Sequence, residues 1–531
     1  MCAQPRVVMV TAMRQPIIGR RAVLGAIAAA PFVRIARAAA QQPPLAYPFT
    51  LGVASGEPAA DGMVLWTRLA PHPHEPHGGM DWQRRTVGWE VAADAGFRTI
   101  AGQGEATAWP DLAHSVHVEV AGLQADRPYW YRFHIGDAVS PIGRTRTAPA
   151  ADARPDRLLF ATVGCQSYES GFYTAYRHLS EERVDFVFHY GDYIYENHAG
   201  EALDSLRAKL PEVRPGVVDE CFSLDDYRAR YTLGKLDPDL QAAHAAAPWF
   251  VTYDDHEVKN DWVSDVDRYR TPPEIFALRR TAAMQAYYEH MPLRAAAFPR
   301  QGVLDIRRRV DWGDLVRAHM LDTRLFRSGP PCGGSWVAPC PDLDSTRLTV
   351  LGAAQEHWLD QGLARSPARW NHIAQQVMMM PLDRRLAGNP AVTPIVNTDS
   401  WAGYNAARDR LLDRFARVGA GNVVVTTGDE HQNFVGDLQR RGRIVATEFV
   451  STSISSGGDG FDFRPGMERV LADNPVVKFC NDRRGYMLCE VTRDRWTTSF
   501  RTVDRVSTPG APIATRARFA VERGRPGAVP A

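Results

Sequence analysis

The sequence has no apolar run long enough to cross a lipid bilayer. A spanning helix needs about 20 mainly apolar residues, whereas the apolar stretch at residues 25–33 is short and rich in alanine. The net charge is also small, because 62 basic residues stand against 61 acidic ones. That balance gives no electrostatic reason to expect a nucleic acid as partner. A G-x-S-x-G motif is missing too, so nothing indicates a serine nucleophile of that type.

Cysteine is scarce, with seven residues in 531. Cys2 lies close to the start, in a segment that we expect to be removed, and Cys165 has a chemical role argued below. Cys332 and Cys340 flank a segment rich in proline and glycine. In an oxidising compartment this spacing predicts a local disulfide, and a pair of buried free thiols is the alternative.

The first 40 residues have the pattern of an export signal. Arg20 and Arg21 precede a short apolar stretch, and alanine-rich cleavage sequences follow at residues 36–40. Paired arginines before a weakly hydrophobic stretch are similar to the twin-arginine signal. We therefore expect residues 1–40 to direct export by the twin-arginine machinery, to the periplasm or the medium. A basic disordered tail is the alternative.

Residues 45–149 are predicted to form an all-β domain. Short alternating runs at residues 63–68, 87–92, 115–120 and 129–135 are separated by Gly, Pro and Asp. The segment 122–131 is similar to the tyrosine corner of fibronectin-like sandwiches, in which a tyrosine hydroxyl bonds back to the chain. A linker rich in Ala, Pro and Asp, residues 147–156, follows.

Residues 157–505 show a different pattern, in which apolar strands alternate with helices. We expect strands at 158–163, 186–189, 249–253, 315–321, 373–378, 423–427 and 444–450, and helices at 172–182, 274–290, 354–364 and 405–418. This alternation favours a layered α/β domain. The last residues, 508–531, are rich in Pro, Gly, Arg and Ala, and we predict that they are poorly ordered.

Four of the expected strands end in polar loops that contain potential metal ligands. In open α/β sheets a ligand site lies at the carboxyl ends of the strands, so we expect these loops to meet. In chain order their side chains are Cys165, Asp192, Tyr195, Asp255, Asp429 and His431.

The chemistry of these side chains predicts metal binding. Three carboxylates in one crevice repel each other unless cations compensate them. Cys165 and His431 are softer ligands that suit a transition metal. Tyr195 could bind as a phenolate, whose charge favours a hard trivalent ion such as ferric iron. Taken singly, each residue is more often a loop cap or a buried side chain, and it is their coincidence that supports the prediction.

The motifs around these residues resemble those of the PhoD-like alkaline phosphatases, a branch of the calcineurin-like metallophosphoesterases. The resemblance extends from residue 49 to residue 503. It implies an N-terminal fibronectin-like β-sandwich followed by an α/β catalytic domain with four αββα layers. The motifs that carry it are GVASGEP (52–58), HYGDYIYE (189–196), DDHEVKND (254–261), RRTAAMQAYYEHMPL (279–293), LDTR (321–324) and GDEH (428–431).

The resemblance implies a site that holds ferric iron (Fe³⁺) together with calcium (Ca²⁺). Cys165, Asp192, Tyr195 and His431 match the family's iron-site residues, with Asp192 bridging to calcium. Asn260 and Asp429 match calcium-site positions. Asp255 stands where related phosphoesterases have an asparagine that binds metal.

The implied activity is hydrolysis of phosphate esters, by attack of an oxide or hydroxide bound to the metals. His256 stands where relatives have a histidine that contacts the phosphate or the leaving group. Arg280, in preference to its neighbour Arg279, is expected to reach the phosphate. The substrate is then a small-molecule or lipid phosphate ester.

Three activities remain open at this point. The first is an exported phosphomonoesterase, and the second is a phosphodiesterase of the same family, including phospholipase D activity on lipid headgroups. The third is a non-haem iron oxidoreductase that uses Cys165, Tyr195 and His431. The third is disfavoured, because such sites usually need two histidines and one carboxylate and only His431 stands out.

Overall fold

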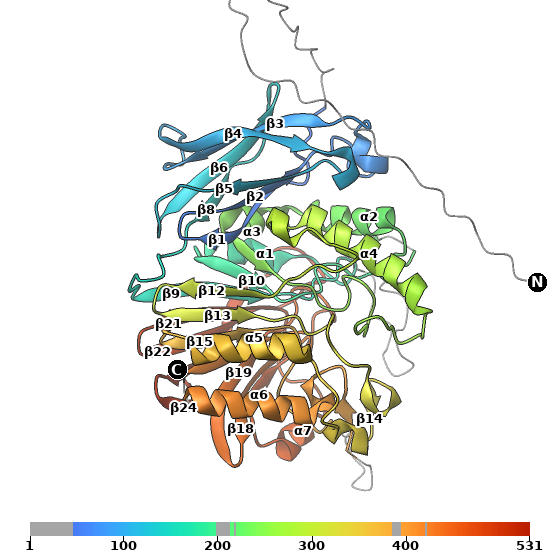
Figure 1. The fold of residues 1–531 in the computed structure, drawn as a ribbon, viewed down its shortest axis with the longest axis vertical. Helices are drawn as coiled ribbons and strands as arrows, with labels where there is room; N and C mark the ends of the chain where they lie inside the picture. Colours follow the sequence, from blue (N-terminus) through green and yellow to red (C-terminus); the bar gives the residue numbers. More distant parts are fainter. Residues whose placement is uncertain (1–45, 198–212, 217–218, 385–393, 420–421) are drawn as a thin grey trace, which may run out of the picture. The chain divides into compact units, whose positions relative to one another are not determined.

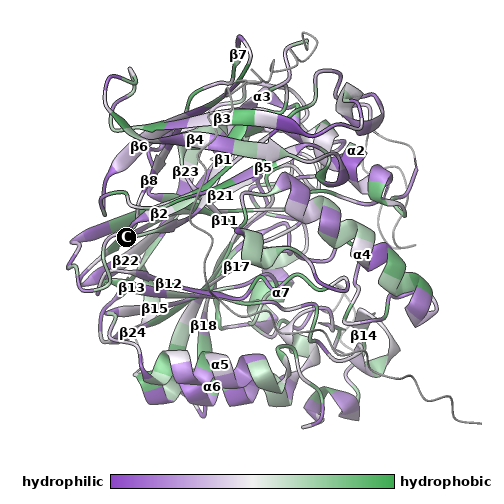
Figure 2. Ribbon diagram, turned by 45° about the horizontal axis from the view of Figure 1, so that its top comes forward, coloured by the Kyte–Doolittle hydropathy of each residue, from purple (hydrophilic) through white to green (hydrophobic). Residues whose placement is uncertain are grey.

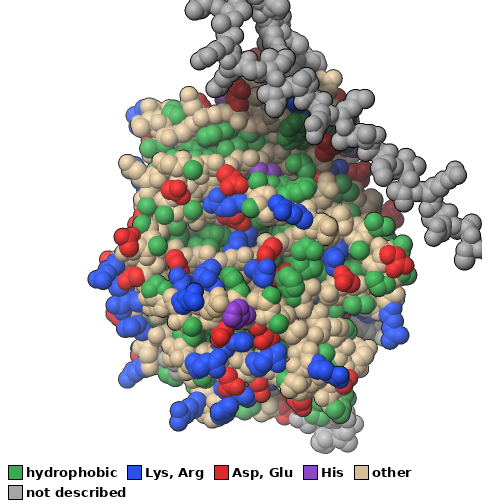
Figure 3. Space-filling view, viewed as in Figure 1, with side chains coloured by type: hydrophobic (Ala, Val, Ile, Leu, Met, Phe, Trp, Pro, Cys, Tyr) green, Lys and Arg blue, Asp and Glu red, His purple; other side chains and the backbone are tan. Residues whose placement is uncertain are grey.

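A computed structural model describes residues 46–197, 213–216, 219–384, 394–419 and 422–531. The predicted signal at residues 1–40 lies outside these ranges. Leu45–Ala531 forms one compact unit, shown in Figure 1. Among the described residues no helix is both long enough and apolar enough to span a membrane. Basic and acidic side chains are intermixed on the face shown in Figure 3, in keeping with the small net charge.

Two large sheets organise this unit. The described part of the chain forms one ten-stranded sheet in the order β24-β23-β22-β21-β9-β10-β11-β1-β2-β5 and one seven-stranded sheet in the order β12-β13-β15-β17-β19-β18-β20. The first consists of β1 Val53–Ala59, β2 Gly62–Arg68, β5 Ser115–Val120, β9 Arg157–Val163, β10 Phe186–His189, β11 Trp249–Val251, β21 Gly485–Thr492, β22 Arg495–Val503, β23 Ile513–Glu522 and β24 Arg525–Pro530. The second consists of β12 Arg308–Trp312, β13 Val316–Met320, β15 Trp370–Ala374, β17 Val423–Thr427, β18 Asn433–Arg440, β19 Arg443–Val450 and β20 Val477–Asn481.

Helices cover the outer face of each large sheet. Those on the ten-stranded sheet include α1 Thr174–Glu181, α2 Leu224–Lys235, α3 Pro238–Ala246 and α4 Pro273–His290, and those on the seven-stranded sheet include α5 Gly352–Ala364 and α6 Asn405–Val418. A short helix, α7 Met467–Asp473, precedes β20. Helix α6 has one apolar face, with Leu411, Leu412 and Phe415 buried, and Figure 2 shows the alternation of polar and apolar positions on α5 and α6.

The main core lies between the two sheets. Phe160 and Phe188 from β9 and β10 belong to the same buried cluster as Trp370, Val424 and Phe449 from the seven-stranded sheet. Continuous apolar runs such as residues 423–425 are typical of parallel strands that are buried on both faces. The layers therefore run helix, sheet, sheet, helix, which confirms the predicted αββα architecture.

The N-terminal part is the predicted β-sandwich. Strands β1, β2 and β5 pack through their own core on a smaller sheet that contains β3 Arg85–Ala92, β4 Ile100–Ala108, β6 Pro128–Ile135, β7 Ala138–Val139 and β8 Gly143–Arg146. The backbone N–H of Gln124 donates to the Tyr129 hydroxyl at 2.9 Å, as expected for a tyrosine corner. One finding was not expected: β1 pairs in parallel with β11, at Gly56 and Trp249. One sheet of the sandwich is therefore continuous with the ten-stranded sheet.

The prediction of a poorly ordered end at residues 508–531 is wrong. Residues 513–522 form β23 and residues 525–530 form β24, at the edge of the ten-stranded sheet. The proline and glycine content suggested disorder, but prolines are tolerated on an edge strand, where no further ladder bond is needed. The segment 519–521 is buried, and Phe519 and Val521 belong to the main core.

The predicted disulfide between Cys332 and Cys340 is present. It closes a loop that contains β14 Trp336–Val337, which pairs antiparallel with β16 Val396–Asn397. These two short strands, which are far apart in the sequence, form a separate two-stranded sheet, which we call the rim sheet. Cys221, Cys480 and Cys489 are buried free thiols.

Candidate metal centre

The predicted ligands lie at the carboxyl ends of strands from both large sheets. Cys165, Asp192 and Asp255 follow the neighbouring parallel strands β9, β10 and β11. Asp429 and His431 follow β17, a central strand of the seven-stranded sheet. The sandwich of two sheets therefore brings both sets of loops to the same place.

The backbone turns sharply at these residues. Cys165, Asp192, Asp429 and His431 have φ values of 52°, 58°, 66° and 54°. Residues other than glycine rarely adopt this left-handed conformation, and such residues cluster at functional sites. Because the chain leaves extended geometry here, Asp429 and His431 can face one site although they are two residues apart.

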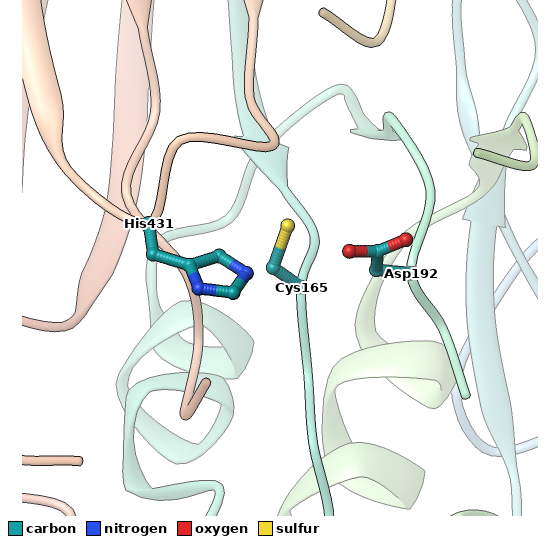
Figure 4. A group of neighbouring side chains, drawn as sticks. All are labelled: Cys165, Asp192 and His431. Carbon is teal, nitrogen blue, oxygen red and sulfur yellow. The ribbon is translucent and has the colours of Figure 1, made fainter. Parts of the chain in front are cut away.

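A soft-ligand group forms one part of the centre. Ligand atoms of Cys165, Asp192 and His431 lie within 4.8 Å of one another, and Figure 4 shows the three side chains converging from different segments. The Tyr195 hydroxyl donates to Asp192 Oδ2 at 3.0 Å and lies 3.0 Å from His431 Nε2. Ser456 Oγ donates to the same hydroxyl at 2.8 Å. All four side chains expected around iron are thus together.

Carboxylates form the other part. Three further groups of side chains have their ligand atoms within 4.8 Å of one another inside each group. They are Asp192–Asp255–His256, Asp254–Asp255–Asp429 and Asp255–Asp261–Asp399. Asp192 and Asp255 are shared between groups. All residues of these three groups except Asp254 line a cavity of about 360 Å³, together with Asn260 and His431.

The electrostatics of these carboxylates fit a bound cation. Burial, together with the neighbouring carboxylates Asp255 and Glu257 and against the opposing effect of His256, raises the pKa of Asp192 to about 8. Burial, with Asp254 and Asp255 nearby, also raises the pKa of Asp429 well above its usual range. Asp254 Oδ2 and Asp255 Oδ1 are buried and accept no hydrogen bond. Cations placed among these oxygens would stabilise the ionised forms.

A buried arginine that the ligand prediction did not include compensates part of this charge. Arg324 is fully buried and pairs with Asp254, with Asp399 at 2.7 Å and with Asp255 at 3.3 Å. Burial alone would raise the pKa of Asp255, but Arg324 and His256 lower it. Arg324 belongs to the LDTR motif, which sequence analysis used only as a marker of the family.

His256 lines the cavity and has a buried carboxylate behind it. Its Nδ1 lies 2.7 Å from Glu196 Oε2, and the backbone N–H of Asn260 donates to Glu196 Oε1 at 2.7 Å. Burial alone would lower the pKa of His256, but Glu196, Asp255 and Asp192 raise it well above its usual range. The Glu196 carboxylate therefore favours the protonated form of the imidazole at the cavity wall. Glu196, the last residue of the HYGDYIYE motif, was missed as a site residue.

Arg280 does not lie where sequence analysis expected it. It is buried in α4 and donates to the Ser264 carbonyl at 2.5 Å and to Asp265 at 2.6 Å. It is not among the residues that line the cavity, whereas Arg384 and Arg464 are. The helix face that carries Arg280 points to the 264–265 turn, so this geometry gives Arg280 a structural contact rather than a position at the substrate.

Comparison with known proteins agrees with this geometry. The PhoD-like phosphatase family profile matches residues 160–500, and that of the PhoD-like phosphatase N-terminal domain matches residues 35–149. The chain is 43% identical over 486 residues to alkaline phosphatase D of Bacillus subtilis (strain 168), covering 91% of this chain and 82% of that protein. A solved structure described as the structure of PhoD superposes with a TM-score of 0.87 at 43% identity, covering 91% of this chain and 92% of the other. On these grounds the chain belongs to the PhoD-like phosphatase family.

Proposed function

We propose that this protein hydrolyses phosphate esters at the metal centre described above. The observation that carries the proposal is the cavity at the strand ends, which is lined by several carboxylates and two imidazoles, with the Cys165 thiol and the Tyr195 hydroxyl next to Asp192 and His431. The similarity to a protein named alkaline phosphatase D supports the reaction class. Within this family the oxidoreductase alternative is not needed.

We propose Cys165, Asp192, Tyr195 and His431 as the residues that hold Fe³⁺, and Asp192, Asp255, Asn260 and Asp429 as those that hold Ca²⁺. Thiolate, imidazole and phenolate suit a transition metal, and carboxylate and amide oxygens suit calcium. Bound metals of this kind neutralise phosphate oxygens and lower the pKa of coordinated water. The shared position of Asp192 supports a bridging role for its carboxylate.

The remaining residues of the site have separate tasks. His256, held protonated by Glu196, can donate a proton to the leaving alcohol oxygen. Glu196 cannot itself reach the cavity surface, because it is fully buried, so it acts by orienting the imidazole. Arg324 keeps Asp254, Asp255 and Asp399 in fixed positions around the cavity.

The substrate range can be measured with three esters. Purified protein loaded with iron and calcium is assayed on an aryl phosphomonoester, on a bis-aryl phosphodiester and on phosphatidylcholine. We expect hydrolysis of the monoester, and the other two substrates reveal diesterase or phospholipase D activity. Chelation of the metals should abolish the activity and their return should restore it. A metal-replete protein that releases no alcohol from any of the three esters refutes the proposed function.

We also propose that the protein is exported by the twin-arginine route to the periplasm or the medium. The sequence around Arg20 and Arg21 supports this, and the Cys332–Cys340 disulfide fits an oxidising compartment. In the double variant Arg20→Lys/Arg21→Lys the precursor should stay in the cytoplasm. Undiminished secretion of that variant would show that another route carries the protein.

A further inference from the structure

The cavity has a second wall that contains none of the predicted ligands. The rim sheet supplies Trp336 from β14 and Asn397 from β16, which pair with each other across the sheet and both line the cavity. The rim sheet is fastened to the site by Ser335, just before β14, whose hydroxyl donates to Asp261 Oδ2 at 2.5 Å. A bound ester would therefore have the metal ligands on one side and the rim sheet on the other.

Trp336 is the large apolar group of this wall. It is 39% exposed although it lines the cavity. Arg384, another lining residue, lies over its ring, with Cζ 5.0 Å from the ring centroid. A tryptophan held in this way offers a flat apolar surface at low cost in side-chain entropy, since the guanidinium already restricts the ring.

The cationic groups of this wall are already paired. Arg384 forms an ion pair with Glu430. Arg464 donates to Asp482 through Nε at 3.1 Å and through Nη2 at 3.2 Å. Because each guanidinium has an acidic partner, the wall offers little attraction to a second anionic group. The large apolar surface that this wall offers is the ring of Trp336.

We propose that Trp336 is a specificity-determining residue that contacts the organic substituent of the phosphate ester and favours aromatic or other flat apolar substituents. This deepens the proposed function and rests on it. The phosphoryl group lies among the metal-site residues, and its substituent extends toward the rim sheet and stacks on the indole.

The Cys332–Cys340 disulfide positions this residue. It closes the loop around β14, while the Thr398 N–H donates to the Ser335 carbonyl at 2.7 Å on the opposite strand. Each strand of the rim sheet has only two residues, and a two-stranded sheet by itself is marginally stable in water. The covalent link therefore restricts the loop that carries Trp336, while the Ser335–Asp261 bond holds this loop at the cavity.

The test measures binding with two unreactive probes, phenylphosphonate and methylphosphonate, as competitive inhibitors of the metal-replete enzyme. Wild-type protein should bind phenylphosphonate more tightly. In Trp336→Ala the ratio of the two inhibition constants should fall by roughly 3- to 10-fold, the range expected for one aromatic contact, and Trp336→Phe should retain most of the preference. The double variant Cys332→Ala/Cys340→Ala should lose much of it.

Trp109 provides a matched control. It is 44% exposed and has Arg84 over its ring at 5.9 Å, but it belongs to the N-terminal part of the chain. Trp109→Ala should leave the ratio at the wild-type value. Circular dichroism and metal content establish that each variant is folded and loaded. If wild-type protein shows no preference, or if Trp336→Ala keeps the wild-type ratio in an active enzyme, the inference is wrong while the proposed function stands. If the wild-type enzyme hydrolyses no ester, both fail.

Discussion

Replacement of Glu196 by glutamine tests the role assigned to His256. The carboxylate accepts two hydrogen bonds at 2.7 Å, one from His256 Nδ1 and one from the Asn260 backbone. A glutamine has one carbonyl oxygen and one NH₂ group, so it can accept only one of these bonds. If its oxygen keeps the Asn260 bond, its NH₂ faces Nδ1 and forces the ring into the other tautomer. In either orientation the imidazolium loses its charged partner.

We expect Glu196→Gln to lower kcat by about 10- to 100-fold, the usual cost of removing a partner that orients a site residue. Metal content should stay near normal, because Glu196 is not among the proposed ligands. The loss should be smaller for an ester of nitrophenol, a good leaving group, than for an alkyl ester, since proton donation matters less there. With the carboxylate gone the pKa of His256 falls, so kcat should decline at lower pH than in the wild type as the imidazole loses its proton.

The matched control is Glu220→Gln. Both Glu196 and Glu220 pair with the buried Lys259, at 3.7 Å and 2.5 Å respectively. Among the described contacts, however, Glu220 does not touch His256. This variant should lose less than about threefold in kcat, as expected for a partly exposed ion pair. An equal loss in both variants, or loss of metal from Glu196→Gln, would refute the assignment of Glu196 as the residue that orients His256.

Three further predictions concern the ligands and the core. Asp192→Ala should lose at least half of the bound metal, whereas His256→Ala should keep near-normal metal and lose about 10²- to 10⁴-fold in turnover. Metal analysis and kinetics of both variants test this prediction. Loss of metal from both variants would place His256 among the ligands. Protein that contains ferric iron should be coloured by charge transfer from tyrosinate or thiolate, and Tyr195→Phe and Cys165→Ser should each change the absorption band; a colourless, active zinc protein would contradict the iron assignment. Burial lowers the pKa of Lys235 to about 7, against about 10.4 in the unfolded chain. Between pH 7 and about pH 10 the unfolded chain therefore binds more protons than the folded chain. The destabilisation of the fold by this lysine is thus complete below pH 7 and becomes smaller as the pH rises to about 10. Lys235→Met should raise the free energy of unfolding by about 1–2 kcal/mol at pH 6, because loss of its contact with the Trp66 ring offsets part of the gain; a gain that does not shrink toward pH 10 would contradict this reasoning.

The position of the metal centre could be predicted from the sequence because it follows from local pattern. Each ligand lies in a loop that follows an apolar strand, and parallel strands place their carboxyl ends at one edge. The helix at 405–418 was predicted with its observed bounds, because its apolar positions repeat with helical spacing.

Long-range pairings could not be read in the same way. Glu196 and His256 are 60 residues apart, and only the fold shows that they touch. Arg280 was expected at the phosphate because the sequence does not reveal which way α4 faces. The C-terminal strands were missed because arginines interrupt the apolar pattern of residues 513–522 and prolines occur in residues 525–530. Composition is a weak guide where a segment gains its stability from a neighbouring sheet.

The parallel pairing of β1 with β11 ties the N-terminal part to the catalytic part more closely than a linker would. If the first 149 residues were removed, β11 would become a free edge of the sheet, with unpaired N–H and C=O groups open to association with other chains. The Trp66 indole would also no longer donate to the Glu289 carbonyl in α4. We therefore expect the two parts to unfold together and neither part to be stable when it is produced without the other.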